Sequence, residues 1–368
     1  MQIIQRFLKT VSLKSLGLLR LAALAKSPLA FMFALLLLSA CEGSVDSYLP
    51  PVASEQNQAQ NTSSQPLKPP SYRMLTDCSD ELITVISLNA YLLFDHRNDG
   101  ARYEKTYSKR DYATKLVNII KFIDNLPCQP NIIAFQEVES KRILKELAEQ
   151  LNGYLGSDYR AILIEGNDQQ GIDNGFLVAS PFELVSTFQV DGRSKRATGG
   201  FIHDRPPLWL RLRHHDNERI FNVINVHMRS MRGLHDHDGG RIQMKRLAQI
   251  ESLVDTLEDM NAQEPLIVLG DWNSYADGDT LESEPIELLI EDTPLQLLTD
   301  FLPEKEQFSY THQRRGVMID HAFANAAARE LVQSYGLVRG VSCATDKRYC
   351  DPTEAVSDHE PLFVQLRF

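Results

Sequence analysis

The stretch PLIVLGDWN, residues 265–273, is an apolar run that ends abruptly in polar side chains. Near-continuous apolar residues are typical of a strand that is covered on both faces. Asp271 and Asn273 follow at the end of this strand, and binding groups often lie at such ends. One polar strand end can equally be an ordinary turn, because Asp and Asn favour turns. The rest of the chain must supply partners if this end is to be a functional site.

Short segments rich in β-branched or aromatic residues alternate along the chain with longer, helix-patterned segments. The predicted strands are residues 81–88, 131–135, 159–164, 174–180, 208–213, 219–228, 265–270, 318–324 and 361–368. The predicted amphipathic helices are residues 110–126, 139–151 and 241–260. This mixture predicts an α+β sandwich of two packed sheets with helices outside.

The chain has 368 residues, of which 43% are hydrophobic, so it can bury a sizeable core. No internal repeat and no second linker follow residue 73. We therefore expect a single domain over residues 73–368.

Residues 1–40 contain five Lys and Arg residues, no acidic residue, and an apolar run too short to span a bilayer comfortably. The sequence LLLLSAC resembles a bacterial lipobox, which predicts a lipoprotein signal peptide and lipidation of Cys41. An ordinary secretory signal or an N-terminal anchor helix is the alternative. Glu42 follows the cysteine, which favours the outer membrane over the inner one. We therefore expect an exported bacterial lipoprotein that is held to the membrane by its acylated end.

Residues 41–72 are rich in Ser, Gln, Asn and Pro and poor in large apolar residues, which predicts a flexible tether. Without residues 1–40 the chain keeps 33 of its 38 Lys and Arg and all 49 Asp and Glu, a net charge of −16. Such a chain has no general attraction for nucleic acid. An anionic substrate would need a local basic site or a bound cation.

Four further cysteines lie in the predicted exported domain, where disulfides are permitted. Four cysteines allow three pairings. We favour Cys343 with Cys350, which closes a short loop, and Cys78 with Cys128. A metal site is the rival interpretation, although neither spacing is CxxC.

Six predicted strand ends carry carboxylate, carboxamide or imidazole groups. These residues are Asn89, Gln136, Glu137, His227, Asp271, Asn273, Asp320, Asp358 and His359. Strand ends meet along the rim of a sheet, so residues far apart in sequence can converge there. We expect them to form one site.

The ordered set ITVISLN, IIAFQEVE, VINVHM, LGDWNS, MIDHAF and SDHEP resembles the endonuclease/exonuclease/phosphatase superfamily over about residues 82–368. That superfamily includes pancreatic-type deoxyribonucleases, apurinic repair endonucleases, neutral sphingomyelinases and inositol polyphosphate phosphatases. The resemblance implies a four-layered α/β sandwich and metal-dependent hydrolysis of phosphoesters.

The resemblance also implies roles for individual residues. Asn89, Glu137 and Asp358 resemble cation ligands, with Mg²⁺ expected and Mn²⁺ or Ca²⁺ possible. Asp320 and His359 resemble the pair in which a carboxylate orients an imidazole. Asp271 and Asn273 resemble the residues that position the nucleophile and a phosphate oxygen.

His227 matches a second histidine found in the deoxyribonuclease-like and sphingomyelinase-like branches. A cation is needed in any case, because charge builds up on phosphate oxygens in the transition state. It would also reconcile an anionic substrate with an acidic chain.

The substrate class is less sharply indicated. Arg229, Arg232, Arg241, Lys245 and Arg246 could form a basic rim that contacts a nucleic-acid backbone, or could be ordinary solvated charges. Asn174 and Arg205 are further candidates for substrate binding, with a purely structural role as the alternative for each. We expect a monomeric exported nuclease acting on DNA or RNA through its phosphate backbone. A phosphatase or a sphingomyelinase-like phospholipase is the alternative.

Three features have no assigned catalytic role. The loop HDHDGG (235–240) could bind a metal but is better interpreted as a polar loop, and the acidic insert 275–285 could narrow the site or bind a second cation. Glu360 is expected to face solvent.

Overall fold

The computed structural model describes residues 71–72, 75, 78–79, 81–343 and 350–368. These residues belong to one compact unit, residues 65–368. The predicted signal peptide, the lipidation site Cys41 and nearly all of the predicted tether lie outside the described residues. The last two tether residues, Ser71–Tyr72, form a short strand, β1, that pairs in parallel with β14 (Val332–Leu337). No helix in the described part of the chain is both long and apolar enough to cross a bilayer.

Two mixed sheets form the centre of the fold. The first has the strand order β1-β14-β15-β2-β3-β5-β4, and the second has the order β10-β13-β9-β8-β7-β6. The remaining strands of the first sheet are β15 (Leu362–Arg367), β2 (Leu82–Leu93), β3 (Ile132–Val138), β5 (Asp173–Val178) and β4 (Arg160–Leu163). Those of the second are β10 (Gln296–Leu297), β13 (Asp320–Ala324), β9 (Leu266–Asp271), β8 (Ile220–His227), β7 (Leu208–His214) and β6 (Phe182–Gln189).

The strands are continuous apolar runs because alternate side chains enter two different hydrophobic cores. On β2, Ile83 and Val85 join the core between the two sheets, whereas Ile86 and Leu88 join a second core beneath helices. Both faces of the strand are therefore buried, as its sequence predicts.

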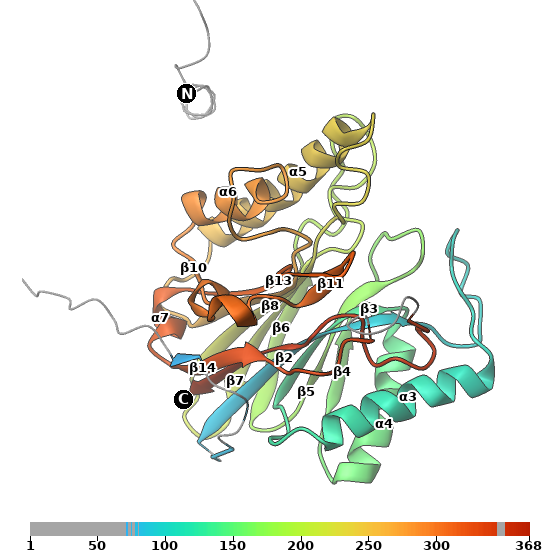
Figure 1. Ribbon diagram of the computed structural model, residues 1–368. Coiled ribbons are helices and arrows are strands. Elements are labelled where there is room, and N and C mark those ends of the chain that lie inside the picture. Colours follow the sequence, from blue (N-terminus) through green and yellow to red (C-terminus); the bar gives the residue numbers. More distant parts are fainter. Residues whose placement is uncertain (1–70, 73–74, 76–77, 80, 344–349) are drawn as a thin grey trace, which may run out of the picture. The chain divides into compact units, whose positions relative to one another are not determined.

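Helices cover the outer face of each sheet (Figure 1). The helices α3 (Lys109–Asp124) and α4 (Lys141–Leu155) pack on the first sheet, and α5 (Gly239–Glu258) packs on the second together with α6 (Glu284–Asp292). The predicted four-layered sandwich is confirmed. A short helix, α7 (Ala326–Arg329), precedes β14.

All nine predicted strands and all three predicted helices are present, with ends shifted by a few residues. Several elements lacked a recognisable pattern: β6, β14, α6 and the hairpin of β11 (Tyr310–His312) and β12 (Arg315–Val317). Both predicted disulfides, Cys78–Cys128 and Cys343–Cys350, are formed.

Candidate functional site

Two parallel strand pairs bring the polar strand ends to one edge of the sandwich. β2 runs parallel to β3, with Asn89 opposite Gln136, and β8 runs parallel to β9, with His227 opposite Asp271. β13 is antiparallel to β9, so its first residue, Asp320, also lies opposite Asp271. The expected convergence of these ends is therefore a consequence of strand direction and register.

Gly270 allows β8 and β9 to approach closely beside Asp271. Its φ is +145°, and a Cβ at this position would lie 2.1 Å from the Val226 carbonyl oxygen. Only glycine fits that space without backbone movement. Asn273 has a φ of +49°, and its N–H donates to Asp271 Oδ1 at 2.9 Å. Asp271 and Asn273 are thus held in one rigid turn.

Asp320 and His359 form a buried carboxylate–imidazole pair. His359 Nδ1 lies 2.6 Å from Asp320 Oδ2, and the backbone N–H of Asp320 donates to Ser309 Oγ. Burial lowers the pKa of His359, but the carboxylates of Asp320, Asp358 and Asp271 outweigh burial and hold that pKa well above its ordinary value. The surrounding carboxylates therefore favour the protonated form of this ring.

His227 lies on the other side of Asp271. The two imidazoles approach Asp271 Oδ2 from different sides, with His227 Nε2 at 3.5 Å and His359 Nε2 at 4.0 Å. Burial is the main cause that lowers the pKa of His227 well below its ordinary value, with further contributions from Arg205 and His359. The pKa values of the two rings are thus shifted in opposite directions, which suits one to accept and the other to donate a proton in the same cleft.

The three predicted cation ligands also belong to this edge. Glu137 Oε1 accepts from Asn89 Nδ2 at 3.3 Å, and Glu137 Oε2 accepts from the Leu92 N–H at 2.9 Å. Glu137 has a φ of +60°, a conformation that non-glycine residues rarely adopt and that often marks functional sites. Asn89 Nδ2 also donates to Asp271 Oδ2 at 3.2 Å.

Asp358 completes this acidic group. Its Oδ1 is buried and has no hydrogen-bond partner among the described residues. Burial raises the pKa values of Asp358 and Asp271, and the charge of Glu137 adds to the shift at both. Crowded carboxylates and an unsatisfied oxygen fit a divalent cation, which prefers oxygen ligands. These residues therefore have the oxygen donors that a divalent cation requires.

The ligand atoms of Asp271, Asp320 and His359 lie within 4.8 Å of one another, which would also suit an ion. However, Asp320 and His359 are hydrogen-bonded directly to each other, which leaves no room for an ion between these two groups. We therefore interpret this trio as a proton-transfer group and place the candidate cation beside Glu137, Asn89 and Asp358.

A cleft of about 810 Å³ opens over these residues. Of the predicted site residues, those that line it are Glu137, Arg205, His227, Asp271, Asn273, Asp358 and His359. Asn89 and Asp320 lie behind this lining and hold it through hydrogen bonds.

The three predicted substrate-binding residues are placed differently from one another. Arg205 lines the cleft, and its guanidinium donates to the carbonyls of Met228 at 2.8 Å and His227 at 3.4 Å. Asn174 is buried, and its Nδ2 donates to the Pro206 carbonyl at 3.0 Å, so it supports the loop that carries Arg205. Arg229 is half-buried and is not part of the cleft lining.

Two expectations about charged residues are wrong, because each side chain is buried and hydrogen-bonded to backbone groups instead of facing solvent. Arg246 does not belong to a basic rim, because it is buried and donates to the carbonyls of Asn273, Leu281 and Glu282. Glu360 does not face solvent. It is buried and accepts the N–H groups of residues 340–342 at 2.9–3.2 Å.

Two residues that support the site were not predicted from the sequence. Tyr310 packs beside the His359 ring with the ring centroids 4.9 Å apart. Lys115 is buried, and its Nζ donates to the carbonyls of Ala355 at 2.6 Å and Tyr91 at 3.2 Å, which fixes the chain before Asp358. The sequence did offer a sign that Lys115 is buried, because this charged residue lies on the apolar side of a predicted helix.

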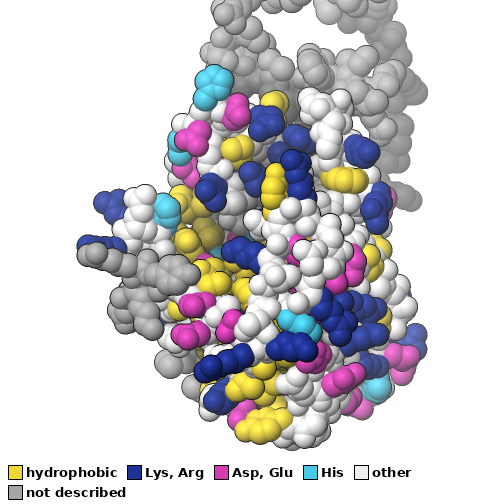
Figure 2. Space-filling view, turned by 90° about the vertical axis from the view of Figure 1, so that its right-hand side faces the viewer, with side chains coloured by type: hydrophobic (Ala, Val, Ile, Leu, Met, Phe, Trp, Pro, Cys, Tyr) yellow, Lys and Arg dark blue, Asp and Glu magenta, His cyan; other side chains and the backbone are white. Residues whose placement is uncertain are grey.

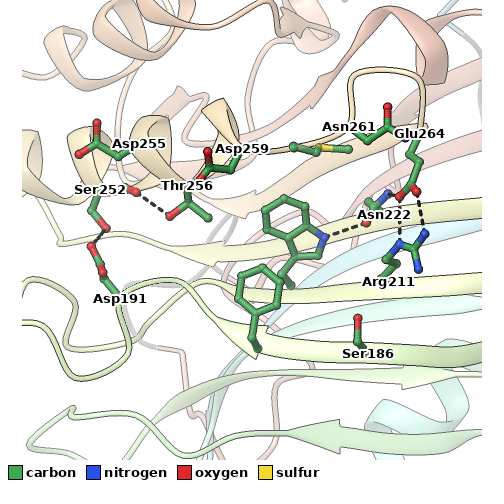
Figure 3. Close-up of a pocket in the computed structure, with 13 residues that line it drawn as sticks. Ser186, Asp191, Arg211, Asn222, Ser252, Asp255, Thr256, Asp259, Asn261 and Glu264 are labelled. Atoms are coloured by element: carbon green, nitrogen blue, oxygen red, sulfur yellow. Dashed lines mark hydrogen bonds and ion pairs between the residues drawn. The ribbon is translucent and has the colours of Figure 1, made fainter.

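A second cavity, of about 670 Å³, lies between α5 and the outer side of β6 and β7 (Figure 3). Its polar groups bind one another: Arg211 and Asn222 both donate to Glu264, and Ser252 donates to Asp191. It contains no histidine. The large cleft is therefore the candidate reaction site.

A model of the endonuclease/exonuclease/phosphatase family matches residues 86–359. The structure of TDP2 from D. rerio complexed with single strand DNA product is 13% identical, with a TM-score of 0.52, and the match covers 78% of this chain and 100% of that one. The human Nocturnin catalytic domain with bound sulfate is 17% identical, with a TM-score of 0.50 and coverages of 79% and 96%. TDP2 from Caenorhabditis elegans is 15% identical, with a TM-score of 0.50 and coverages of 78% and 74%. These likenesses show a shared fold. No curated protein matches the sequence.

Proposed function

Because the chain belongs to the endonuclease/exonuclease/phosphatase family and is therefore a phosphoester hydrolase, we propose that it is a Mg²⁺-dependent nuclease. Its substrate would be the phosphodiester backbone of DNA or RNA. The observation that carries the proposal is the arrangement of two buried histidines in the cleft, with His227 Nε2 at 3.5 Å and His359 Nε2 at 4.0 Å from Asp271 Oδ2.

Hydrolysis of a phosphodiester requires that water loses a proton as it attacks phosphorus and that the departing oxygen gains one when the P–O bond breaks. His227 and His359 can divide these transfers because their pKa values are shifted in opposite directions and both line one cleft. Asp320 keeps His359 oriented through Nδ1, so that Nε2 faces the reacting groups. A divalent cation held by Glu137, Asn89 and Asp358 would offset the charge that develops on the phosphate oxygens.

Asp271 and Asn273 would position the attacking water and one phosphate oxygen. The turn that carries them is rigid, so both groups are placed before substrate arrives. Arg205 lies in the cleft lining with part of its guanidinium committed to two carbonyls, and it would add positive charge near the phosphate.

Nucleic acid is favoured as the substrate because the segment after His227 carries Arg229 and Arg232, and no carboxylate of the described residues lies within ion-pair distance of either. A TDP2 neighbour of the same fold is described with a DNA product, which is compatible with this choice.

We further propose that the protein is exported and anchored through lipidated Cys41 to the outer membrane, where it acts as a monomer. Two disulfides support an oxidising compartment. Palmitate labelling of the full chain and of a Cys41→Ser variant, followed by membrane fractionation, tests this. Equal labelling of both would contradict lipidation at Cys41.

The alternative is a phosphatase, an activity that the family's name includes, or a sphingomyelinase-like phospholipase. The deciding experiment offers the full chain plasmid DNA, RNA, sphingomyelin vesicles and inositol phosphates in parallel, with Mg²⁺ or with chelator. We expect DNA or RNA to be cut only when Mg²⁺ is present. If nucleic acids survive while a lipid or inositol phosphate is hydrolysed, the nuclease proposal is wrong.

A further inference from the structure

A second basic segment, linked to the end of β8 through α5, is not explained by the reaction chemistry. Residues 190–203 between β6 and β7 carry Arg193, Lys195 and Arg196. Within the described ranges, no carboxylate lies within 4.0 Å of these three cations. In a chain with an excess of acidic residues, a group of uncompensated cations calls for a physical reason.

This segment is a structured hairpin. Lys195 pairs with Phe201 across it, and the Ile202 N–H donates to the Ser194 carbonyl at 2.9 Å. The Lys195 ammonium lies 5.4 Å from the centre of the Phe201 ring. The cations therefore have a defined placement that a mobile loop would not provide.

The side chain of Gln249 on α5 joins this hairpin to the catalytic edge. Its Nε2 donates to the Ile202 carbonyl at 3.2 Å, and its Oε1 accepts the Arg229 N–H at 2.8 Å. Arg229 follows His227 by two residues. The hairpin, α5 and the end of β8 are thus held together by one buried side chain.

The cations that these segments carry are close enough to repel one another. Lys245, one turn before Gln249, feels the positive charges of Arg196 and Arg229, and it has one carboxylate partner, Asp204, at 2.5 Å. Arg196 Nε is buried without a hydrogen-bond partner among the described residues. Like charges held together with too few carboxylates form a site for a polyanion. Figure 2 shows Lys and Arg side chains gathered over the upper part of this side of the molecule, where α5 and its neighbouring loops lie.

We propose that Lys195, Arg196, Arg229 and Lys245 hold a nucleic-acid strand that leaves the cleft, at phosphates beyond the one that is cleaved. This inference rests on the proposed nuclease function and makes a chain-like substrate the preferred one. Phe201, half-buried beside Lys195, offers an aromatic surface for a base of the same strand. An anionic membrane is the rival partner for such a surface.

The test compares wild type with the double variant Lys195→Gln/Arg196→Gln in the full chain. The matched control is Lys141→Gln/Lys145→Gln, which removes the same charge from exposed positions on α4, on the outer face of the other sheet. Substrates are a single-stranded oligonucleotide of roughly 20 nucleotides and a dinucleotide, which has no phosphodiester beyond the one that is cleaved. Binding of the oligonucleotide is also followed by fluorescence anisotropy without Mg²⁺, so that it does not depend on turnover.

We expect the double variant to bind the oligonucleotide about tenfold more weakly than wild type, and its KM for the oligonucleotide to be about tenfold higher. Its kinetics on the dinucleotide should be unchanged. The salt dependence of oligonucleotide binding should become less steep, by about 1.4 in the log–log slope for two lost contacts. The control variant should behave as wild type.

Unchanged oligonucleotide binding in the double variant would overturn the inference while leaving the nuclease function intact. An equal loss of activity on the dinucleotide would also overturn the inference, because Lys195 and Arg196 would then act on the cleaved phosphodiester itself. If wild type binds no oligonucleotide and the double variant loses binding to phosphatidylglycerol vesicles, the surface is a membrane contact. Failure of the nuclease function is recognised separately, as absence of turnover of either nucleotide substrate by wild type.

Discussion

Asp320 Oδ2 and His359 Nδ1 lie 2.6 Å apart although the two residues are 39 positions apart in sequence. The contact forms because β13 and β15 start at the same edge of the sandwich, in different sheets. It raises the pKa of a buried imidazole and orients the second ring nitrogen towards Asp271.

Replacing Asp320 by Asn should keep the hydrogen-bonding shape but remove the charge that raises the pKa of His359. We expect kcat to fall by about 10²–10⁴-fold. The pH–rate limb due to His359 should move to lower pH, which a kcat profile would reveal. The exposed Asp292→Asn variant serves as the control. An unshifted profile would contradict the pairing.

Glu137→Gln should weaken divalent-cation binding at least tenfold, because a carboxylate ligand becomes neutral. Titration calorimetry with Mn²⁺ measures this without reference to activity. Hydrolysis should fall to background while circular dichroism stays unchanged, and Glu137→Ala should behave likewise. Glu149→Gln, exposed on α4, is the control. Wild-type affinity and turnover in Glu137→Gln would remove Glu137 from the site.

Arg246→Lys should misplace Asn273, whose carbonyl accepts from the Arg246 guanidinium at 2.9 Å. Lysine cannot satisfy the same set of carbonyls, so we expect about 2–3 kcal/mol lower stability. A kcat loss of about tenfold or more should exceed any change in KM, since a small displacement harms orientation. Arg213→Lys, at an exposed position, provides the comparison in urea unfolding and kinetics. A pure stability loss with normal kcat would make Arg246 merely structural.

His203 should make the protein acid-sensitive. Burial lowers the pKa of His203 to about 4 from an ordinary 6.5, so the unfolded chain takes up its proton first. The contribution of neutral His203 is complete above about pH 6.5 and is lost as the pH falls towards 4, by on the order of 3 kcal/mol. Urea unfolding across this range should show a weaker pH dependence for His203→Gln than for wild type. Parallel curves would refute the assignment.

The two disulfides should differ in their contribution to stability. Cys78–Cys128 closes a separation of 50 residues, and Cys343–Cys350 closes one of 7. The loop-entropy model gives about 4 and about 2 kcal/mol respectively. Paired Cys→Ser variants compared by urea unfolding measure the difference, and equal losses would contradict the model here.

Much of the fold was predictable because its signals are local. Continuous apolar strands such as 265–270 and amphipathic helices such as 241–260 are specified by spacing alone. β6 and the hairpin of β11 and β12 were missed because their residues are partly exposed and carry no clear alternation. The ordered polar strand ends, from Asn89 to His359, were sufficient to predict one site.

Sequence patterns did not predict which charged residues are buried or which groups they bind. In SDHEP, Asp358 and His359 were predicted to belong to the site, whereas Glu360 was expected in solvent and instead accepts three backbone N–H groups. Arg246, Lys115 and Asn174 likewise hold backbone that is distant in sequence. Periodicity and motif order come from neighbouring residues, so the chain alone carries them. Whether a charge meets water or a buried carbonyl depends on which distant segments pack against it, and only the assembled sandwich decides that.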